Sequence, residues 1–204
     1  MRQFLPVCVL LPGFLALLPG AGIKNESPST VTVILDFKGP WSRVSIQEMQ
    51  RESGSILKSS GVRLGWEFLG EHPTATYNDL VVMTFKGPCE FEPASPRYDE
   101  LGPYALTRTS DGEVLPFGEV DCRRVLQSVL DVISGGDFDR GDQLLGRALG
   151  RVVAHELVHM LTKSEKHGSE GVEKAALSGK QLIAPVLPLS AFDVGRLKRQ
   201  MDGH

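Results

Sequence analysis

Residues 155–159 read His-Glu-Leu-Val-His, with two histidines four positions apart and a glutamate directly after the first. On an α-helix, four residues advance about 6 Å and return to nearly the same face, so both imidazoles can reach one metal ion. Glu156 lies about 100° around the helix from His155, beside the ion without ligating it. From there a carboxylate can take a proton from zinc-activated water. The spacing predicts a hydrolytic zinc centre with His155 and His159 as ligands and Glu156 as general base.

The segment around this motif has the pattern of a buried helix. It begins near Asp142, and apolar residues flank the motif at 152–154 and 160–161. A buried position keeps the histidines neutral, which metal ligation requires. The competing interpretation is two surface histidines on a helix with an ordinary charge beside them.

The elements that must position this helix can be predicted from residue periodicity and turn residues. Ser45 and Glu48 have the spacing of a capping box, which predicts a helix that starts there. Ser110-Asp111-Gly112 is the strongest hairpin signal in the chain. We expect strands at 31–37, 62–69, 79–85, 104–109 and 113–120, and helices at 45–60, 122–133, 142–161 and 190–201. This order predicts an α+β fold in which helices pack on a mixed sheet.

Length and charge indicate one soluble domain. The chain has 204 residues, 41% of them hydrophobic, and a net charge of -3. These values argue against a nucleic-acid partner, and we expect a monomer. Residues 1–22 combine Arg2, a Leu-rich apolar run and a small-residue end, which is typical of a signal peptide. We therefore expect a secreted or periplasmic domain at 23–204, with no membrane association once the leader is removed.

Cysteine usage agrees with export. Removal of the leader removes Cys8 and leaves Cys89 and Cys122. Two cysteines in an exported domain most simply form one disulfide. The alternative is that they ligate zinc, but their spacing matches no zinc-ribbon pattern.

The motif His155-Glu156-Leu157-Val158-His159, followed by His167, resembles the active-site helix of zincin metalloproteases, on the metzincin side of that clan. The stretch from His155 to about Leu182 is similar to small, secreted bacterial zincin-like proteins, which share the third histidine and a run like Ser178-Gly179-Lys180. The resemblance implies a zincin-like fold and one zinc per chain, bound by His155, His159 and His167. It also implies that Glu156 is the catalytic residue of a zinc metallopeptidase, an endopeptidase acting on peptide or protein substrates.

The chain departs from the metzincin pattern in four places. The seven-residue spacer between His159 and His167 is longer than usual, and Lys163 stands where the longer variant would have glycine. Glu173 occupies the slot of the methionine that metzincins place beneath the metal, and no tyrosine follows Tyr104. These departures motivate an alternative function, a metal-binding zincin-like module that does not cleave peptides. If zinc is absent, a non-metal interaction domain is a third possibility.

The third ligand needs a change of chain direction. If the helix continued, His167 would lie about 12 Å beyond His159, far outside a zinc–nitrogen bond of about 2.0–2.1 Å. We therefore predict a helix end between Leu161 and Lys166, with the break at 162–164. Other candidates for the third ligand are Glu173, Glu170 and Glu165. An exposed edge strand within 104–120 would let a substrate bind by strand addition.

Overall fold

The computed structural model describes residues 30–72, 74–77, 79–94 and 102–201. The predicted leader at 1–22 lies outside the described residues. The strands are β1 (Thr30–Phe37), β2 (Arg63–Phe68), β3 (Leu80–Lys86), β4 (Ala105–Ser110) and β5 (Glu113–Asp121). The helices are α1 (Arg43–Leu57), α2 (Cys122–Leu130), α3 (Gly141–Thr162), α4 (Gly179–Ile183) and α5 (Ala191–Met201). Short 3-10 turns occupy Lys58–Ser60, Gly135–Arg140 and Gly171–Glu173.

The five strands form one mixed sheet in the order β2-β1-β3-β5-β4. The first four of these strands are mutually parallel, and β4 is antiparallel to β5. Asp111 and Gly112 both have positive φ, 52° and 80°, in the tight turn that joins β4 to β5. This hairpin places β4 at the edge of the sheet, where no described strand pairs with its outer side.

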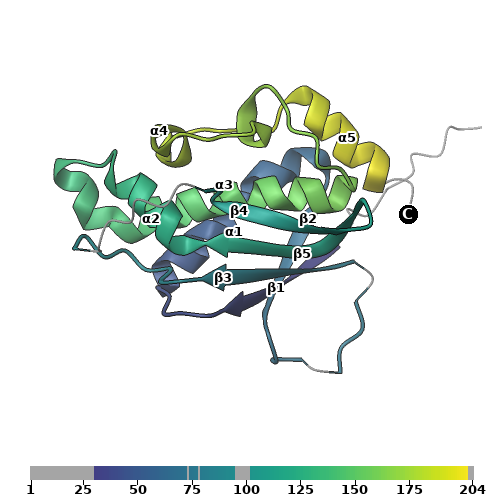
Figure 1. The fold of residues 1–204 in the computed structure, drawn as a ribbon, viewed down its shortest axis with the longest axis horizontal. Coiled ribbons are helices and arrows are strands. Elements are labelled where there is room, and N and C mark those ends of the chain that lie inside the picture. Colours follow the sequence, from purple (N-terminus) through teal and green to yellow (C-terminus); the bar gives the residue numbers. More distant parts are fainter. Residues whose placement is uncertain (1–29, 73, 78, 95–101, 202–204) are drawn as a thin grey trace, which may run out of the picture.

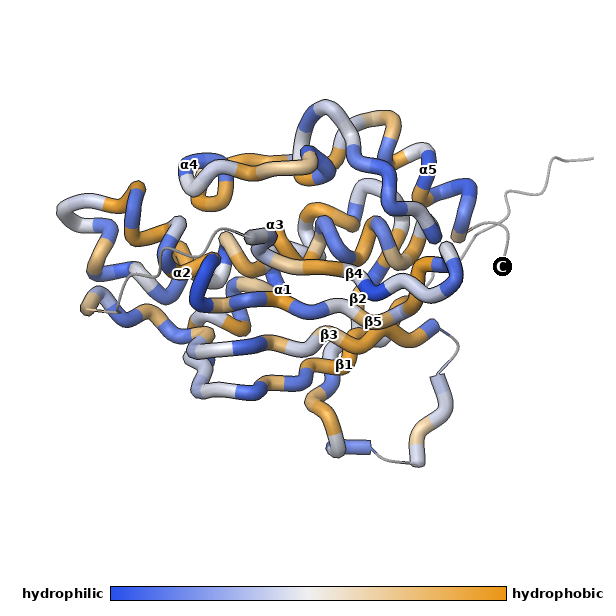
Figure 2. The backbone as a smooth tube through the Cα atoms, in the orientation of Figure 1, coloured by the Kyte–Doolittle hydropathy of each residue, from blue (hydrophilic) through white to orange (hydrophobic). Residues whose placement is uncertain are grey.

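Helices cover one face of the sheet. Figure 1 shows α1 and α3 against that face, and α4 and α5 above the edge formed by β4. The central strands point their most buried side chains, among them Leu35, Met83 and Val120, toward the helices. Figure 2 shows that hydrophobic residues concentrate along α3 and the strands beside it. The prediction of an α+β fold with a mixed sheet packed by helices is confirmed.

Two glycines let α1 and α3 approach closely. A Cβ added at Gly146 would lie 2.4 Å from the carbonyl oxygen of Ser45, and one added at Gly150 would lie 2.8 Å from that of Met49. Any larger residue at these positions would force the helices apart. Because α3 carries the histidine motif, this contact sets its depth in the molecule.

The predicted start of α1 is wrong. The helix begins at Arg43, and Ser42, not Ser45, is its N-cap, accepting from the Ser45 amide. Ser45 is fully buried, and its hydroxyl donates to the Asp142 carboxylate at 2.8 Å. The spacing of Ser45 and Glu48 predicted a helix cap, but the Ser45 side chain instead connects α1 to Asp142 of α3. The sequence prediction also missed α4, although Ser178 and Gln181 form its capping box.

The predicted disulfide between Cys89 and Cys122 is present, with a Cα–Cα distance of 5.1 Å. It joins the segment after β3 to the first residue of α2. No helix within the described ranges is long and apolar enough to cross a membrane.

Candidate metal centre

The helix that carries the motif ends where the sequence predicted a break. α3 stops at Thr162, and Lys163 adopts a left-handed conformation with φ 50° and ψ 42°. The amides of Lys163 and Ser164 both donate to the carbonyl of His159. A non-glycine residue in this conformation costs roughly 1–2 kcal/mol, so the surrounding contacts must maintain the reversal.

The reversal brings three histidines together. One ring nitrogen from each of His155, His159 and His167 lies within 4.8 Å of the others, and this is the one such group in the described part of the chain. The Nε2 atoms of His155 and His159 are 3.1 Å apart. Nitrogens that share a tetrahedral zinc ion at about 2.0–2.1 Å are separated by about 3.3–3.4 Å. The spacing therefore fits a common metal ion.

Backbone carbonyls orient the two helical imidazoles. The Nδ1 atom of His155 lies 2.8 Å from the carbonyl oxygen of Val172, and that of His159 lies 2.6 Å from the carbonyl oxygen of Ser164. A carbonyl can only accept, so each Nδ1 carries the proton and donates it. Each Nε2 then keeps its lone pair and could ligate a metal, as in histidine-ligated metal sites.

Burial also favours the neutral, ligating form of these rings. Desolvation lowers the pKa of His155 to about 4, with the neighbouring histidines adding to the effect. Desolvation likewise lowers the pKa of His159. Burial therefore favours the neutral imidazole in both rings, with the proton on Nδ1 and a free lone pair on Nε2 for a metal. His167 is exposed and approaches from the solvent side.

Glu156 lies beside the cluster as a buried acid. It is 4% exposed, and burial raises its pKa to about 7, against the opposing effect of a hydrogen bond from Thr107. The Thr107 hydroxyl lies 2.6 Å from Glu156 Oε2. A carboxyl group with a pKa near neutrality can both accept and return a proton under ordinary conditions. Sequence reasoning missed Thr107, because nothing in a strand pattern shows which residue faces a distant helix.

Glu173 occupies an unusual position next to His155. Its side chain is fully buried, neither oxygen has a hydrogen-bond partner in the described residues, and Oε1 lies 3.6 Å from His155 Nδ1. Burial, reinforced by the charge of Asp193, raises the pKa of Glu173 to about 9, so the carboxyl is neutral at pH 7. It faces the Nδ1 edge of His155, while the cluster forms around Nε2. The structure therefore brings His167, and not Glu173, to the other two histidines.

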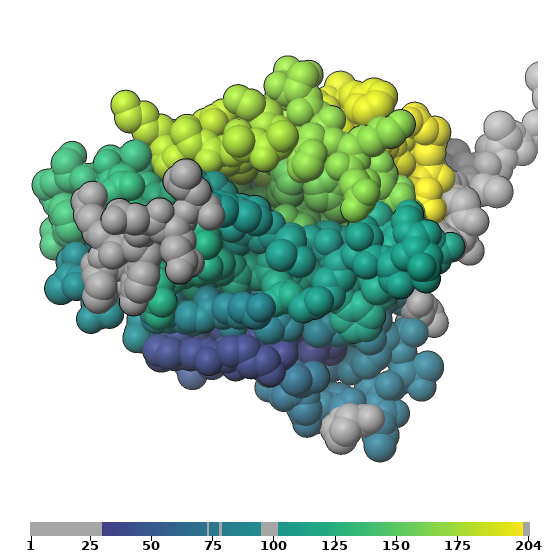
Figure 3. Space-filling view, viewed as in Figure 1, coloured from purple at the N-terminus to yellow at the C-terminus, as the bar shows by residue number. Residues whose placement is uncertain are grey.

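The three histidines and Glu156 line a cavity of about 490 Å³. Residues 102–107, which include the start of β4, form one wall, and residues 174–177 form the other. Figure 3 shows the groove between these two parts of the chain. A substrate in this cavity would lie between the edge strand and the segment that follows Glu173.

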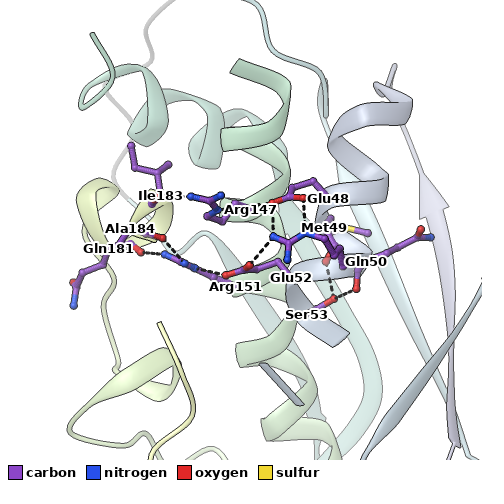
Figure 4. Close-up of polar contacts among 11 residues, drawn as sticks. Glu48, Met49, Gln50, Glu52, Ser53, Arg147, Arg151, Gln181, Ile183 and Ala184 are labelled. Atoms are coloured by element: carbon purple, nitrogen blue, oxygen red, sulfur yellow. Dashed lines mark hydrogen bonds and ion pairs between the residues drawn. The ribbon is translucent and has the colours of Figure 1, made fainter. Parts of the chain in front are cut away.

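The far wall continues into α4, which is anchored to the motif helix by Arg151 (Figure 4). Arg151 is fully buried one turn before His155; its Nε bonds to Glu52 of α1 at 2.9 Å. Its terminal nitrogens donate to the carbonyls of Gln181 within α4 and of Ala184, the C-cap of α4. One side chain thus connects α1, α3 and the segment behind the cavity wall.

Comparison with known proteins assigns no family to the chain. No protein-family model matches it, and no curated protein matches it. Among solved structures it is similar to the crystal structure of archaemetzincin (amzA) from Methanopyrus kandleri, with a TM-score of 0.49 and 11% sequence identity. The match covers 88% of this chain and 99% of that one. At this identity and TM-score, the functional conclusions depend on the site geometry alone.

Proposed function

We propose that this protein is a zinc-dependent peptidase with one zinc per chain, bound by His155, His159 and His167. One observation carries the proposal: three histidine nitrogens converge in a cavity that also contains the buried carboxyl group of Glu156. Metal ligands and a titratable proton acceptor in one cleft are the minimum set for metal-assisted hydrolysis.

The donor set fits a catalytic zinc better than a structural one. Three imidazole ligands leave a fourth position open, whereas structural zinc sites are usually closed by four protein ligands, often cysteines. Cys89 and Cys122 are joined to each other and are not available as thiolates. All three histidines line the cavity, so a molecule in the cavity can reach the cluster.

The residues of the site have defined tasks in peptide hydrolysis. Zinc, when bound, would activate water and polarise the scissile carbonyl. The Glu156 carboxylate accepts a proton from the attacking water as the new carbon–oxygen bond forms. It then donates that proton to the departing amine nitrogen as the carbon–nitrogen bond breaks. The pKa of about 7 suits both steps, because the group changes protonation state near neutral pH.

The substrate that this cavity suits best is an extended peptide. β4 is an edge strand, and residues of its first half line the cavity wall. A peptide could add to its free side through backbone hydrogen bonds, with pockets for alternate side chains.

The alternative is a module that binds metal and peptide without cleavage. It is favoured by the state of two hydroxyl groups that line the cavity: the Tyr104 hydroxyl is bonded to Ser128 and the Thr107 hydroxyl to Glu156, so neither is free to stabilise the oxyanion that forms during cleavage. The same cavity and edge strand would then serve binding alone.

One set of preparations decides between these functions. We expect about one zinc per chain by metal analysis, and cleavage of unfolded casein that a chelator abolishes. Glu156→Ala should keep its zinc and lose hydrolysis, because Glu156 lies beside the histidines without belonging to their cluster. Glu170→Ala, which removes an exposed carboxylate outside the cavity, should keep both.

Undiminished turnover in Glu156→Ala would refute the catalytic role. Bound zinc without any chelator-sensitive cleavage would support the binding module.

We also propose that the protein is exported after removal of residues 1–22, and acts as a secreted or periplasmic monomer without a nucleic-acid partner. The Cys89–Cys122 disulfide supports export, because such bonds persist mainly in oxidising compartments. The net charge of -3 agrees with the absence of a nucleic-acid partner.

A further inference from the structure

Thr107 connects the edge strand to the buried acid of the site. Its Oγ1 lies 2.6 Å from Oε2 of Glu156 and 3.4 Å from the Glu156 backbone oxygen. An ionised carboxylate only accepts hydrogen bonds, so the hydroxyl is the donor. Within the described residues, this is the sole hydrogen bond that the Glu156 side chain makes.

The backbone at this point is irregular. Thr107 pairs with Gly118 of β5, but the register shifts between Thr107 and Thr109. Such bulges change the direction of a side chain and often occur at sheet edges near active sites. The β-branched side chain of threonine has few χ1 positions in a strand, so its hydroxyl has a well-defined direction. The sheet thus presents one rigid donor to the motif helix.

This hydrogen bond distinguishes the two oxygens of Glu156. Oε2 is bonded to Thr107, whereas Oε1 makes no hydrogen bond with the described residues. Glu156 lines the cavity, so Oε1 is the oxygen free to meet a proton there. Holding Oε2 restricts rotation of the carboxyl group, and preorganisation of this kind lowers the cost of reaching the reactive geometry.

We propose that Thr107 is a positioning residue, which fixes the Glu156 carboxyl group so that Oε1 faces the cavity. This inference depends on the proposed peptidase function and deepens it. β4 would hold the substrate backbone and, through Thr107, the group that exchanges protons with it. The distance between the scissile bond and the base would then be set by a single strand.

The experiment compares Thr107→Val, which removes the hydroxyl but keeps the shape, with Thr107→Ser, which keeps the hydroxyl. Thr109→Val is the matched control, because Thr109 lies exposed on the same strand and does not line the cavity. We expect Thr107→Val to keep one zinc and the wild-type melting temperature while kcat falls about 10–100-fold. KM should stay within about twofold of wild type, because the strand that holds the peptide is unchanged. Thr107→Ser should recover most of the rate, and Thr109→Val should match wild type.

A second readout does not depend on activity. The carboxyl carbon-13 resonance of Glu156, identified by its loss in Glu156→Gln, should move in Thr107→Val and stay in place in Thr109→Val. Wild-type kcat in Thr107→Val, or equal losses in the valine and serine variants, would overturn the positioning role. If the wild-type protein cleaves no peptide, the peptidase proposal fails, and an unmoved Glu156 resonance in Thr107→Val then refutes the contact itself.

Discussion

Each histidine on the motif helix is oriented by a residue that lies beyond the helix end. His159 donates to Ser164 in the reversal, and His155 donates to Val172 in the 3-10 turn that follows. The segment after α3 therefore supplies His167 and also the two carbonyls that orient its partners. A substitution in this segment that displaces either carbonyl should weaken metal binding even though no ligand is altered.

His167→Ala should lower zinc affinity by orders of magnitude, because it removes one of three nitrogens that converge on a single point. Glu173→Gln should bind zinc nearly as well as wild type, because Glu173 faces the opposite edge of the His155 ring. Zinc titration of both variants in identical buffer tests this. The reverse ranking would make Glu173 the third ligand and exclude His167.

The buried carboxyl of Glu173 also predicts a pH effect on the metal-free protein. Its pKa is about 9 in the folded chain against an ordinary value of 4.5, so folding favours the protonated form. The resulting stability is fully present below about pH 4.5 and is lost progressively as the pH rises toward 9. Glu173→Gln, which cannot ionise, should lose less stability over this range.

Urea unfolding of chelator-treated protein at pH 5, 7 and 9 measures the difference. Glu156 is retained in both proteins, so the stability that its own raised pKa contributes is present in both, and the difference between the curves reports the Glu173 carboxyl together with its interaction with Glu156. Parallel stability curves for the two proteins would show that Glu173 ionises freely in the folded state.

At the scale of elements, α3 depends on long-range contacts for its position. Glycines let α1 approach it closely, and Arg151 links it to Glu52 of α1 and to the end of α4. The cavity wall at 174–177 lies in sequence between His167 of the histidine cluster and α4, so the hydrogen bonds of Arg151 to Gln181 and Ala184 hold one of its two ends.

Arg151→Met should destabilise the fold by about 3–5 kcal/mol, because it leaves Glu52 with only the exposed Arg51 as a partner and removes the donor to the Gln181 and Ala184 carbonyls. Arg147→Met is the matched control one turn earlier on α3. Arg147 also spans from α1 to α4, since its Nη1 donates to the Ile183 carbonyl at 3.1 Å, but it is partly exposed and its Nε lies 3.8 Å from Glu48. Its loss should therefore cost less, about 1 kcal/mol. Denaturant unfolding of the two variants gives the comparison, and equal losses would show that the Arg151 linkage adds nothing specific.

At the scale of the whole molecule, the disulfide joins the centre of the sheet to the helical layer. Cys89 follows β3, and Cys122 begins α2, 33 residues later. A crosslink that closes such a loop restricts the unfolded chain and contributes about 3–4 kcal/mol in the chain-entropy model.

We expect the unreduced mature protein to have a mass lower by two hydrogen atoms than the reduced form. Reduction should lower the free energy of unfolding by about 3–4 kcal/mol. Mass spectrometry and denaturant titration with and without a reductant check both values. Two free thiols in protein recovered from an oxidising compartment would contradict the structure and weaken the proposal of export.

Local rules were enough to predict most elements and part of the site. The i, i+4 spacing of His155 and His159 places both rings on one helix face in any helix, and a turn such as Asp111-Gly112 needs only neighbouring residues to form. The helix end near Lys163 could be predicted because a continuous helix would hold His167 too far from His155 and His159 for the three side chains to bind one metal ion. The α1 cap failed because Ser45 had two possible partners, and packing against Asp142 prevailed over the local one.

Contacts between residues far apart in sequence could be decided only by the tertiary structure. Thr107 and Glu156 are 49 positions apart, and Glu52 and Arg151 are 99 apart. Whether the residues of each pair come into contact depends on the order of the strands in the sheet and on the distance between the packed helices. Neither of these can be predicted from the periodicity of hydrophobic residues in the sequence. The raised pKa values of Glu156 and Glu173 could not be predicted from the sequence either. Desolvation raises them, and the extent of desolvation depends on all the residues packed around a carboxyl group, most of which are distant in sequence.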